Sequence, residues 1–179
     1  MPEGKIAYEQ EAINEIASVL NLQYYRDSEV ERIFLSELLR PWGVLKKYCY
    51  KGTVHDLNFK TTLKRIPEFQ AVVMEIINKY SYPLKDVGVF VMPVERGRAY
   101  HCEADFYCDV SRPDELQKVK QMWLEASERL INEGAFFDRP YGQWADMVYR
   151  RAGTYTQKLK QLKKELDPNN ILNPGHLCF

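Results

Sequence analysis

The chain has 179 residues, 45% of them hydrophobic, which is enough to bury one core with some appended helices. Basic and acidic residues number 25 each, so the net charge is zero and we expect neither nucleic acid nor an anionic membrane as a partner. No apolar run approaches the roughly 20 residues of a membrane-spanning helix, and the start MPEGKIAYEQEAINE lacks the apolar stretch of a signal peptide. These features predict a cytoplasmic protein without a membrane span.

The cysteines and histidines show no metal-binding pattern. A structural zinc site requires ligands in close pairs such as CxxC, which this sequence does not contain. We therefore predict no metal site and expect reduced cysteines that pack as small apolar side chains. The cysteines are Cys49, Cys102, Cys108 and Cys178.

Residues 1–55 are predicted to form a helical segment. Apolar residues recur at helical spacing at Ile13, Ile16, Ala17 and Leu20. A second helix is expected to begin after Asp27 or Ser28, either of which would cap it, and to end before Pro41. Residues 42–56 carry a weaker pattern, and we assign them a short helix followed by a loop.

The next segment predicts a strand, a helix and a second strand. Residues 57–64 alternate apolar and polar side chains, as a half-buried strand does. Pro67 then opens a helix. Its apolar stripe consists of Phe69, Val72, Val73, Ile76, Ile77 and Tyr80. Residues 87–94 are rich in β-branched side chains and predict the second strand, which the polar residues 95–98 connect to the next strand as a hairpin turn.

The second half of this region repeats the arrangement. Residues 99–109 predict a third strand, Pro113 opens a long amphipathic helix that ends at Gly134, and residues 135–137 predict a short fourth strand. The order β-α-β-β-α-β is the ferredoxin-like, split-βαβ arrangement, an α+β fold with an antiparallel sheet and both helices on one side. We therefore predict a ferredoxin-like domain over residues 56–140, with its other sheet face free.

The third strand places titratable side chains on that free face. One side of the strand carries Tyr100, Cys102, Ala104, Phe106 and Cys108, which suit the helix-packed side. The other side carries His101, Glu103, Asp105 and Tyr107. Such a row is either a solvated surface or, if another domain covers it, a functional site, because buried charges must be paired.

The loop after the fourth strand, residues 138–146, is dense in functional side chains. Arg139 is a candidate to bind a carboxylate or phenolate through its planar guanidinium. The alternative is a structural ion pair with Asp138 or Asp146. An amphipathic helix follows, with apolar positions at Tyr155, Leu159, Leu162 and Leu166.

The end of the chain resembles a known family. Helix lysines followed by LDPNNILNPGHL (residues 166–177) resemble the C-terminus of FAD-linked oxidases of the vanillyl-alcohol oxidase and p-cresol methylhydroxylase superfamily. The aspartate, both prolines and the glycine keep the family's spacing. Phe137, Asp138 and Arg139 after Gly134 are similar to the family's glycine, strand and arginine ahead of that helix. The resemblance extends over about residues 57–179.

This resemblance implies a two-domain flavoenzyme in which a cap, here residues 56–140, covers the FAD ring and shapes a pocket for a phenolic or hydroxylated small molecule. Arg139 resembles the arginine that stabilises a phenolate in phenol-oxidising members, and Tyr141 would assist it. FFDRPYGQW stands where the glycolate and D-lactate branch has an SGEHGIG-like stretch, which favours phenolic substrates over simple 2-hydroxy acids.

The candidate site residues follow from these two arguments. Arg139 and Tyr141 are candidate catalytic residues by resemblance, and His101 is one by its place on the third strand. Candidate pocket residues are Glu103, Asp105, Tyr107, Asp138 and Trp144. By the same resemblance, Asn173 and Gly175 would contact the cofactor.

The chain departs from the family in lacking a flavin-binding part. It has nine glycines and no cluster of them to hold a pyrophosphate. We therefore expect FAD to bind only with a separate FAD-binding domain or subunit, onto which residues 141–179 would pack, and we expect the chain to be inactive alone. Some family members attach FAD covalently through a cap histidine or tyrosine, and the resemblance makes His55 and the tyrosines candidates for such an attachment, although no local motif assigns one of them.

A second hypothesis is that the chain is a non-catalytic ferredoxin-like binding or assembly module. It predicts a homo-oligomer that forms through the open sheet face without FAD. RNA binding through that face is disfavoured, because the aromatic RNP pattern and a basic charge are missing.

Overall fold

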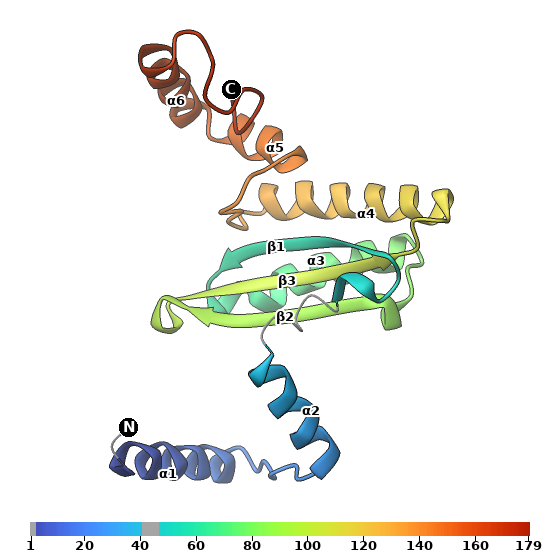
Figure 1. The fold of residues 1–179 in the computed structure, drawn as a ribbon, viewed down its shortest axis with the longest axis vertical. Coiled ribbons are helices and arrows are strands. Elements are labelled where there is room, and N and C mark those ends of the chain that lie inside the picture. The colour runs from blue at the N-terminus through green and yellow to red at the C-terminus, as the bar shows by residue number, and fades with distance from the viewer. Residues whose placement is uncertain (1–2, 41–46) are drawn as a thin grey trace. The chain divides into compact units, whose positions relative to one another are not determined.

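The computed structural model describes residues 3–40 and 47–179, in two compact units, Met1–Leu45 and Lys46–Phe179. The first unit contains α1 (Glu3–Val19) and α2 (Ser28–Leu39), close to the helices expected from the sequence (Figure 1). Asp27 caps α2, because its Oδ1 accepts hydrogen bonds from the backbone N–H groups of Glu29 at 2.9 Å and Val30 at 3.2 Å. Neither helix buries a residue.

A three-stranded antiparallel sheet forms the centre of the second unit. Its strands are β1 (Thr53–Thr61), β2 (Val87–Val94) and β3 (Ala99–Cys108), in the order β1-β3-β2. The central strand β3 is antiparallel to both neighbours (Figure 1). A short helical turn, η4 (Glu95–Gly97), connects β2 to β3 where a hairpin turn was predicted. The predictions of β2 and β3 are confirmed.

The first strand begins and ends earlier than predicted. We expected it over residues 57–64, but β1 starts at Thr53, and Leu63 lies in the turn η2 (Leu63–Arg65) with 60% of its surface exposed. The reason is the partner strand. β3 offers backbone partners along the whole of β1, so Thr53 pairs with Cys108 even though the residues at the start of β1 show no strong alternation. The predicted short helix before this strand lies partly outside the described residues.

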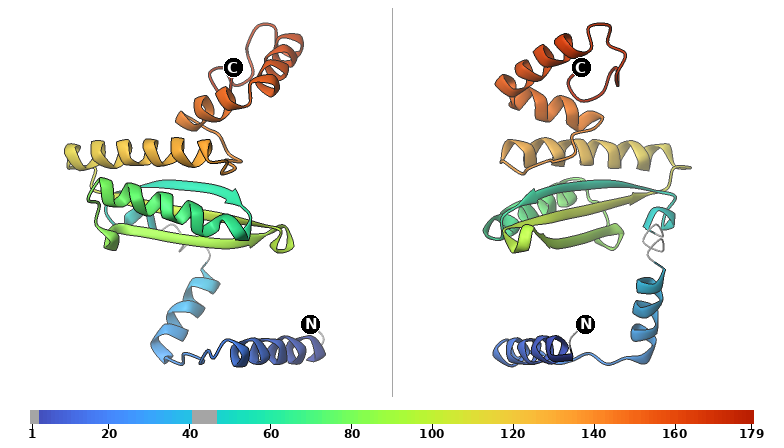
Figure 2. Two further views of the ribbon diagram at one scale, coloured as in Figure 1. Left: turned by 180° about the vertical axis from the view of Figure 1, so that it is seen from behind. Right: turned by 60° about the vertical axis from the view of Figure 1, so that its left-hand side comes forward.

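Two helices pack against the sheet and enclose the core. They are α3 (Ile66–Lys79) and α4 (Pro113–Asn132), both with proline in the first turn as predicted. Figure 2 shows α3 lying across the sheet face that points away from the viewer in Figure 1. The two helices contact each other, and α4 also contacts β1 and β3. The largest fully buried side chains of this core are Phe69, Phe106, Leu57, Ile76, Ile77, Met122, Leu130 and Val119.

The predicted fourth strand is reduced to a single bridge. Gly134 ends α4 in a left-handed conformation with φ of 93°. Phe136 then pairs with Lys60 of β1, with N···O distances of 2.7 and 3.0 Å. The sheet therefore has three strands rather than the predicted four, extended on the β1 side by one residue pair.

The last part of the chain contains two helices, α5 (Gln143–Arg151) and α6 (Gly153–Leu166). Only the second was predicted. A further turn, η3 (Leu84–Asp86), precedes β2. Across the described ranges 3–40 and 47–179, none of the helices has the length and apolar character that crossing a membrane requires.

Candidate functional site

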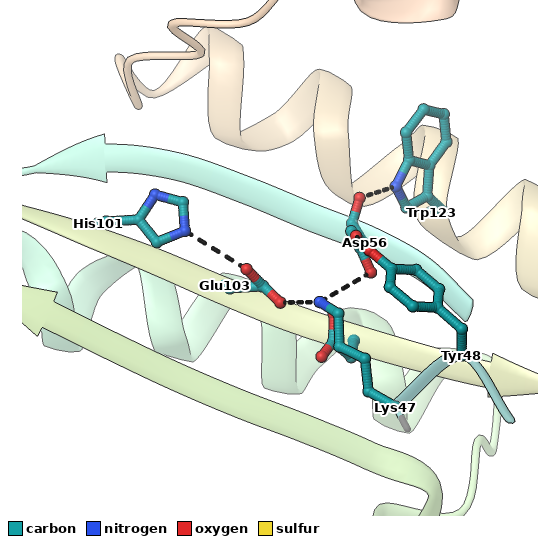
Figure 3. Close-up of polar contacts among 7 residues, drawn as sticks. Lys47, Tyr48, Asp56, His101, Glu103 and Trp123 are labelled. Atoms are coloured by element: carbon teal, nitrogen blue, oxygen red, sulfur yellow. Dashed lines mark hydrogen bonds and ion pairs between the residues drawn. The ribbon is translucent and has the colours of Figure 1, made fainter. Parts of the chain in front are cut away.

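The sheet face opposite α3 carries a connected set of titratable side chains (Figure 3). Glu103 and Asp105 project from β3, and the β1–β3 register places Asp56 directly opposite Asp105. Lys47, from the segment before β1, reaches across the strands to these carboxylates. We call Lys47, Asp56, His101, Glu103 and Asp105 the polar-face cluster.

Lys47 is the centre of this cluster. Its ammonium forms an ion pair with Glu103 and lies 3.4 Å from Asp56 Oδ1 and 3.5 Å from Asp105 Oδ1. Burial by itself would lower the pKa of Lys47, but the hydrogen bond to Glu103 and the charges of the carboxylates raise it above the usual range. Lys47 therefore stays charged and balances part of the negative charge.

Asp105 is the carboxyl of the cluster that holds its proton most strongly. Burial, the hydrogen bond to Asp56 and the charge of Glu103 raise the pKa of Asp105 to about 7. A hydrogen bond between two carboxyls requires a proton on one of them. Burial would also raise the pKa of Glu103, but hydrogen bonds from Lys47, Asp105 and His101 hold it below the usual value. The cluster thus combines a proton-bearing acid with an ionised carboxylate.

Gly88 of β2 makes room for this acid pair. It lies opposite Asp105 in the β2–β3 register. A Cβ atom at position 88 would come within 3.0 Å of Asp105 Cβ and 3.3 Å of the Tyr107 hydroxyl. A larger residue would therefore push Asp105 or Tyr107 aside.

His101 and Tyr107 lie at the two ends of the row on β3. His101 Nε2 lies 3.4 Å from Glu103 Oε2, and its ring meets Phe90 of β2 edge to face at 6.3 Å. The Tyr107 ring meets Tyr50 at 5.1 Å. The structure thus brings together four of the predicted site residues, namely His101, Glu103, Asp105 and Tyr107.

Sequence reasoning missed the residues that cover this face. Besides Lys47 and Tyr50, Tyr48 donates a hydrogen bond from its hydroxyl to Asp56 at 3.3 Å. The face is therefore partly covered by the chain's own residues 47–50, and the side chain of Asp105 is only 9% exposed. The alternating polar residues of β1, including Asp56, would have been the one signal available for this half of the cluster.

The core holds the cluster in place through two tryptophans. Trp123 of α4 donates its indole N–H to the backbone oxygen of Asp56 at 2.7 Å (Figure 3). Its ring stacks on Trp144 at 5.1 Å, and the Trp144 indole N–H donates to Ser127 Oγ at 2.8 Å. Trp144, predicted to line a substrate pocket, is therefore a buried core residue because its ring and its N–H both find partners inside.

The residues after the Phe136 bridge occupy a neighbouring surface. Asp138 forms an ion pair with Lys60 at 2.8 Å, and Lys60 lies opposite His101 in the β1–β3 register. Arg139 and Tyr141 are exposed, and within the described residues the Arg139 side chain forms neither a hydrogen bond nor an ion pair. The alternative expectation, an ion pair of Arg139 with Asp138 or Asp146, is not what the structure contains.

Asn173 and Gly175 lie in the C-terminal segment, away from the polar-face cluster along the chain. Both adopt positive φ, and the His176 N–H donates to the Asn173 oxygen. The same segment is organised by Asp167, whose carboxylate accepts from the N–H groups of Ile171 at 2.8 Å and Leu172 at 2.9 Å. The LDPNNILNPGHL sequence thus has a local structural role.

The cluster has the donors for a cation, but Lys47 already supplies one. Carboxylate oxygens of Asp56, Glu103 and Asp105 lie within 4.8 Å of one another, a spacing that could hold a metal ion. The Lys47 ammonium contacts the same three groups. His55, considered for covalent flavin attachment, points to the helix side of β1, where its ring meets Trp123 at 6.3 Å and burial lowers its pKa.

Comparisons with known proteins add no assignment. No model of a protein family matches the chain, and no curated protein matches it.

Proposed function

We propose that this chain is the C-terminal, substrate-covering part of a cytoplasmic FAD-dependent oxidoreductase that acts on a phenolic or hydroxylated small molecule. A separate domain or subunit would hold the flavin. The observation that carries the proposal is the row of His101, Glu103 and Asp105 on the sheet face opposite the core, where one hydrogen-bonded network joins them. The resemblance of residues 166–177 to FAD-linked oxidases supplies the reaction class.

We further propose that the sheet is a ferredoxin-like βαββαβ unit whose fourth strand is very short. The order across the sheet is the Phe136 bridge, β1, β3 and β2, with α3 between β1 and β2 in the chain and α4 between β3 and the bridge. This is the connectivity expected of a split βαβ fold. It supports a cap-like role for the unit.

This chain alone does not fit the pyrophosphate of FAD. A pyrophosphate is held by several backbone N–H groups of a glycine-rich turn at a helix start. The described glycines are isolated, and Gly4, Gly142, Gly153 and Gly175 have no neighbouring atom that forms a cradle around them. We therefore propose that the cofactor is bound by the separate domain or subunit and that this chain would contribute side chains on the substrate side.

The polar-face cluster can accept and donate protons near neutral pH. A carboxyl whose pKa is about 7, as for Asp105, can accept a proton from a substrate hydroxyl and return it. Lys47 would hold the neighbouring carboxylates in position throughout, because its charge is retained. His101 lies at the outer end of the network, toward Lys60 and Asp138.

Arg139 is the proposed anion-binding residue. Its guanidinium is exposed and forms no hydrogen bond or ion pair among the described residues, although its charge helps to lower the pKa of Asp138, so it can bind a phenolate or carboxylate. Tyr141 is exposed two residues later and could contribute a hydroxyl. The ion pair of Lys60 with Asp138 connects this loop to the sheet.

Co-expression with a separate glycine-rich flavin-binding polypeptide tests the proposal. We expect a yellow complex whose flavin is reduced by phenols, whereas the chain with free FAD alone should retain no flavin. In the complex, Arg139→Ala should slow flavin reduction by about 100-fold. Arg96→Ala, an exposed arginine in η4, is the matched control. Failure of the two polypeptides to associate would overturn the proposed function, and unchanged reduction by Arg139→Ala would overturn the role of Arg139.

A second candidate function is a non-catalytic assembly module. It is favoured by the exposed apolar side chains along β2, where Val89 is 69% and Phe90 49% exposed. Self-association without any dependence on FAD, combined with no flavin-binding partner, would favour this function over the first.

A further inference from the structure

The outer edge of β2 has unpaired backbone groups and lacks the features that usually protect a sheet edge in the described part of the chain. β3 pairs with one side of β2, and among the described residues no strand pairs with its other side. Sheet edges are commonly protected by charged residues, bulges or covering elements, because unpaired N–H and C=O groups invite another strand. The sequence of β2, VGVFVMPV, carries no charge, and only Pro93 near its end lacks an N–H.

The side chains of this edge strand are apolar and exposed on both faces. Exposed fractions are 69% for Val89, 49% for Phe90, 45% for Val91 and 43% for Met92. Val89 and Val91 also line an apolar groove beside α3, together with Met74. The opposite edge of the sheet differs, because β1 is bridged by Phe136 and flanked by the Lys60–Asp138 ion pair.

We infer that β2 pairs with β2 of a second copy of this chain in an antiparallel, two-fold symmetric manner centred on Phe90. Phe90 then faces its own copy, and Val89 of each chain faces Val91 of the other. Both chains present the same uncharged strand, so pairing brings no like charges together. The result is a continuous six-stranded sheet whose valine pairs bury the exposed apolar surface.

Charge complementarity supports this register. Lys85 in the turn η3 and Glu95 in the turn η4 lie just outside the two ends of β2, are exposed, and form no side-chain hydrogen bond or ion pair within the described part of the chain. Centring on Phe90 brings the end of β2 that is next to Lys85 in each chain close to the end that is next to Glu95 in the other, twice by symmetry. A shift by two residues, the smallest that preserves the hydrogen-bond pattern, would set Lys85 beside Pro93 or Gly97.

Sedimentation equilibrium of the full-length chain over a range of concentrations tests the inference. We expect a monomer–dimer equilibrium that Val89→Lys weakens at least tenfold, since the lysine would be buried between apolar partners. Leu63→Lys is the matched control, because Leu63 is 60% exposed but lies outside β2, and it should leave dimerisation unchanged. Unchanged circular dichroism would show that both variants are folded.

A charge-reversal pair tests the register. Lys85→Glu should weaken the dimer by about tenfold, because it replaces two attractive contacts with two repulsive ones. Lys85→Glu combined with Glu95→Lys should restore most of the affinity. A monomer at every concentration, or equal effects of Val89→Lys and Leu63→Lys, overturns the dimer. Loss of affinity without rescue overturns the register, and association only with a flavin-binding polypeptide overturns the second copy as the occupant.

Discussion

Asp105 has the most perturbed environment of the polar-face cluster. Its side chain is nearly buried, faces Asp56 and Glu103, and shares Lys47 with them. A pKa of about 7 means that the folded protein keeps a proton that the unfolded chain releases above the ordinary value of 3.8. Protonated Asp105 therefore contributes most to the free energy of unfolding at low pH. This contribution is lost as the pH rises through about 7.

We expect Asp105→Asn to remove this fall in the free energy of unfolding between low pH and pH 8. Asparagine keeps the shape but cannot ionise, so at pH 8 the variant should be more stable than the wild type by on the order of 1–2 kcal/mol, with little difference at pH 4. Urea unfolding at both pH values measures this. Asp146→Asn, an exposed aspartate in α5, should retain the wild-type profile. A pH profile for Asp105→Asn that runs parallel to that of the wild type would contradict the raised pKa of Asp105.

At the scale of elements, the end of α6 and the C-terminal segment form one local structure. Asp167 accepts from two backbone N–H groups and from Lys163, which also bonds to the Leu172 oxygen. These hydrogen bonds lower the pKa of Asp167 to about 2. The stability that these hydrogen bonds contribute is present at pH values above the ordinary aspartate pKa of 3.8 and is lost as the pH falls through about 2.

Asp167→Ala should therefore release the C-terminal segment without unfolding the sheet. We expect the amides of Ile171 and Leu172 to exchange at least tenfold faster and protease cleavage to increase after residue 167, while the core amides are unchanged. Hydrogen exchange read by mass spectrometry provides the measurement. Glu165→Ala, which removes only an exposed contact with Gln161 in the same helix, is the control. Equal protection in the two variants would show that Asp167 does not organise this segment.

At the scale of the whole molecule, stability is distributed unevenly. The strands β1 and β3 and the helices α3 and α4 supply most of the buried side chains, whereas α1 and α2 bury none. Isolated helices of this length are only marginally stable in water, because tertiary packing usually provides most of their stability.

Hydrogen exchange of the full chain should reveal this difference. Amides of α1 and α2 should exchange at least 100-fold faster than those of β1 and β3, whose opening requires disruption of the core. Addition of the proposed flavin-binding polypeptide should slow exchange only in segments that it contacts. Equal protection of α1 and β3 in the chain alone would show that the apolar side chains of α1 are packed.

The amino-acid sequence by itself determined the elements whose burial is one-sided and local. The stripe from Phe69 to Ile77 predicted α3, and the alternation along residues 99–108 predicted which side of β3 faces the core. It therefore also predicted that His101, Glu103 and Asp105 share the other face. Such patterns are readable because each residue's environment repeats with the period of its own helix or strand.

Tertiary structure alone decided which groups meet across the chain. Lys47 forms an ion pair with Glu103, which lies 56 residues later in the sequence. Trp144 is a core residue because its ring stacks on Trp123 and its indole N–H donates to Ser127. β1 begins at Thr53 because β3 provides backbone partners, not because its first residues alternate. Contacts of this kind depend on how elements that are distant in the sequence pack together, so the local pattern of apolar and polar residues cannot predict them.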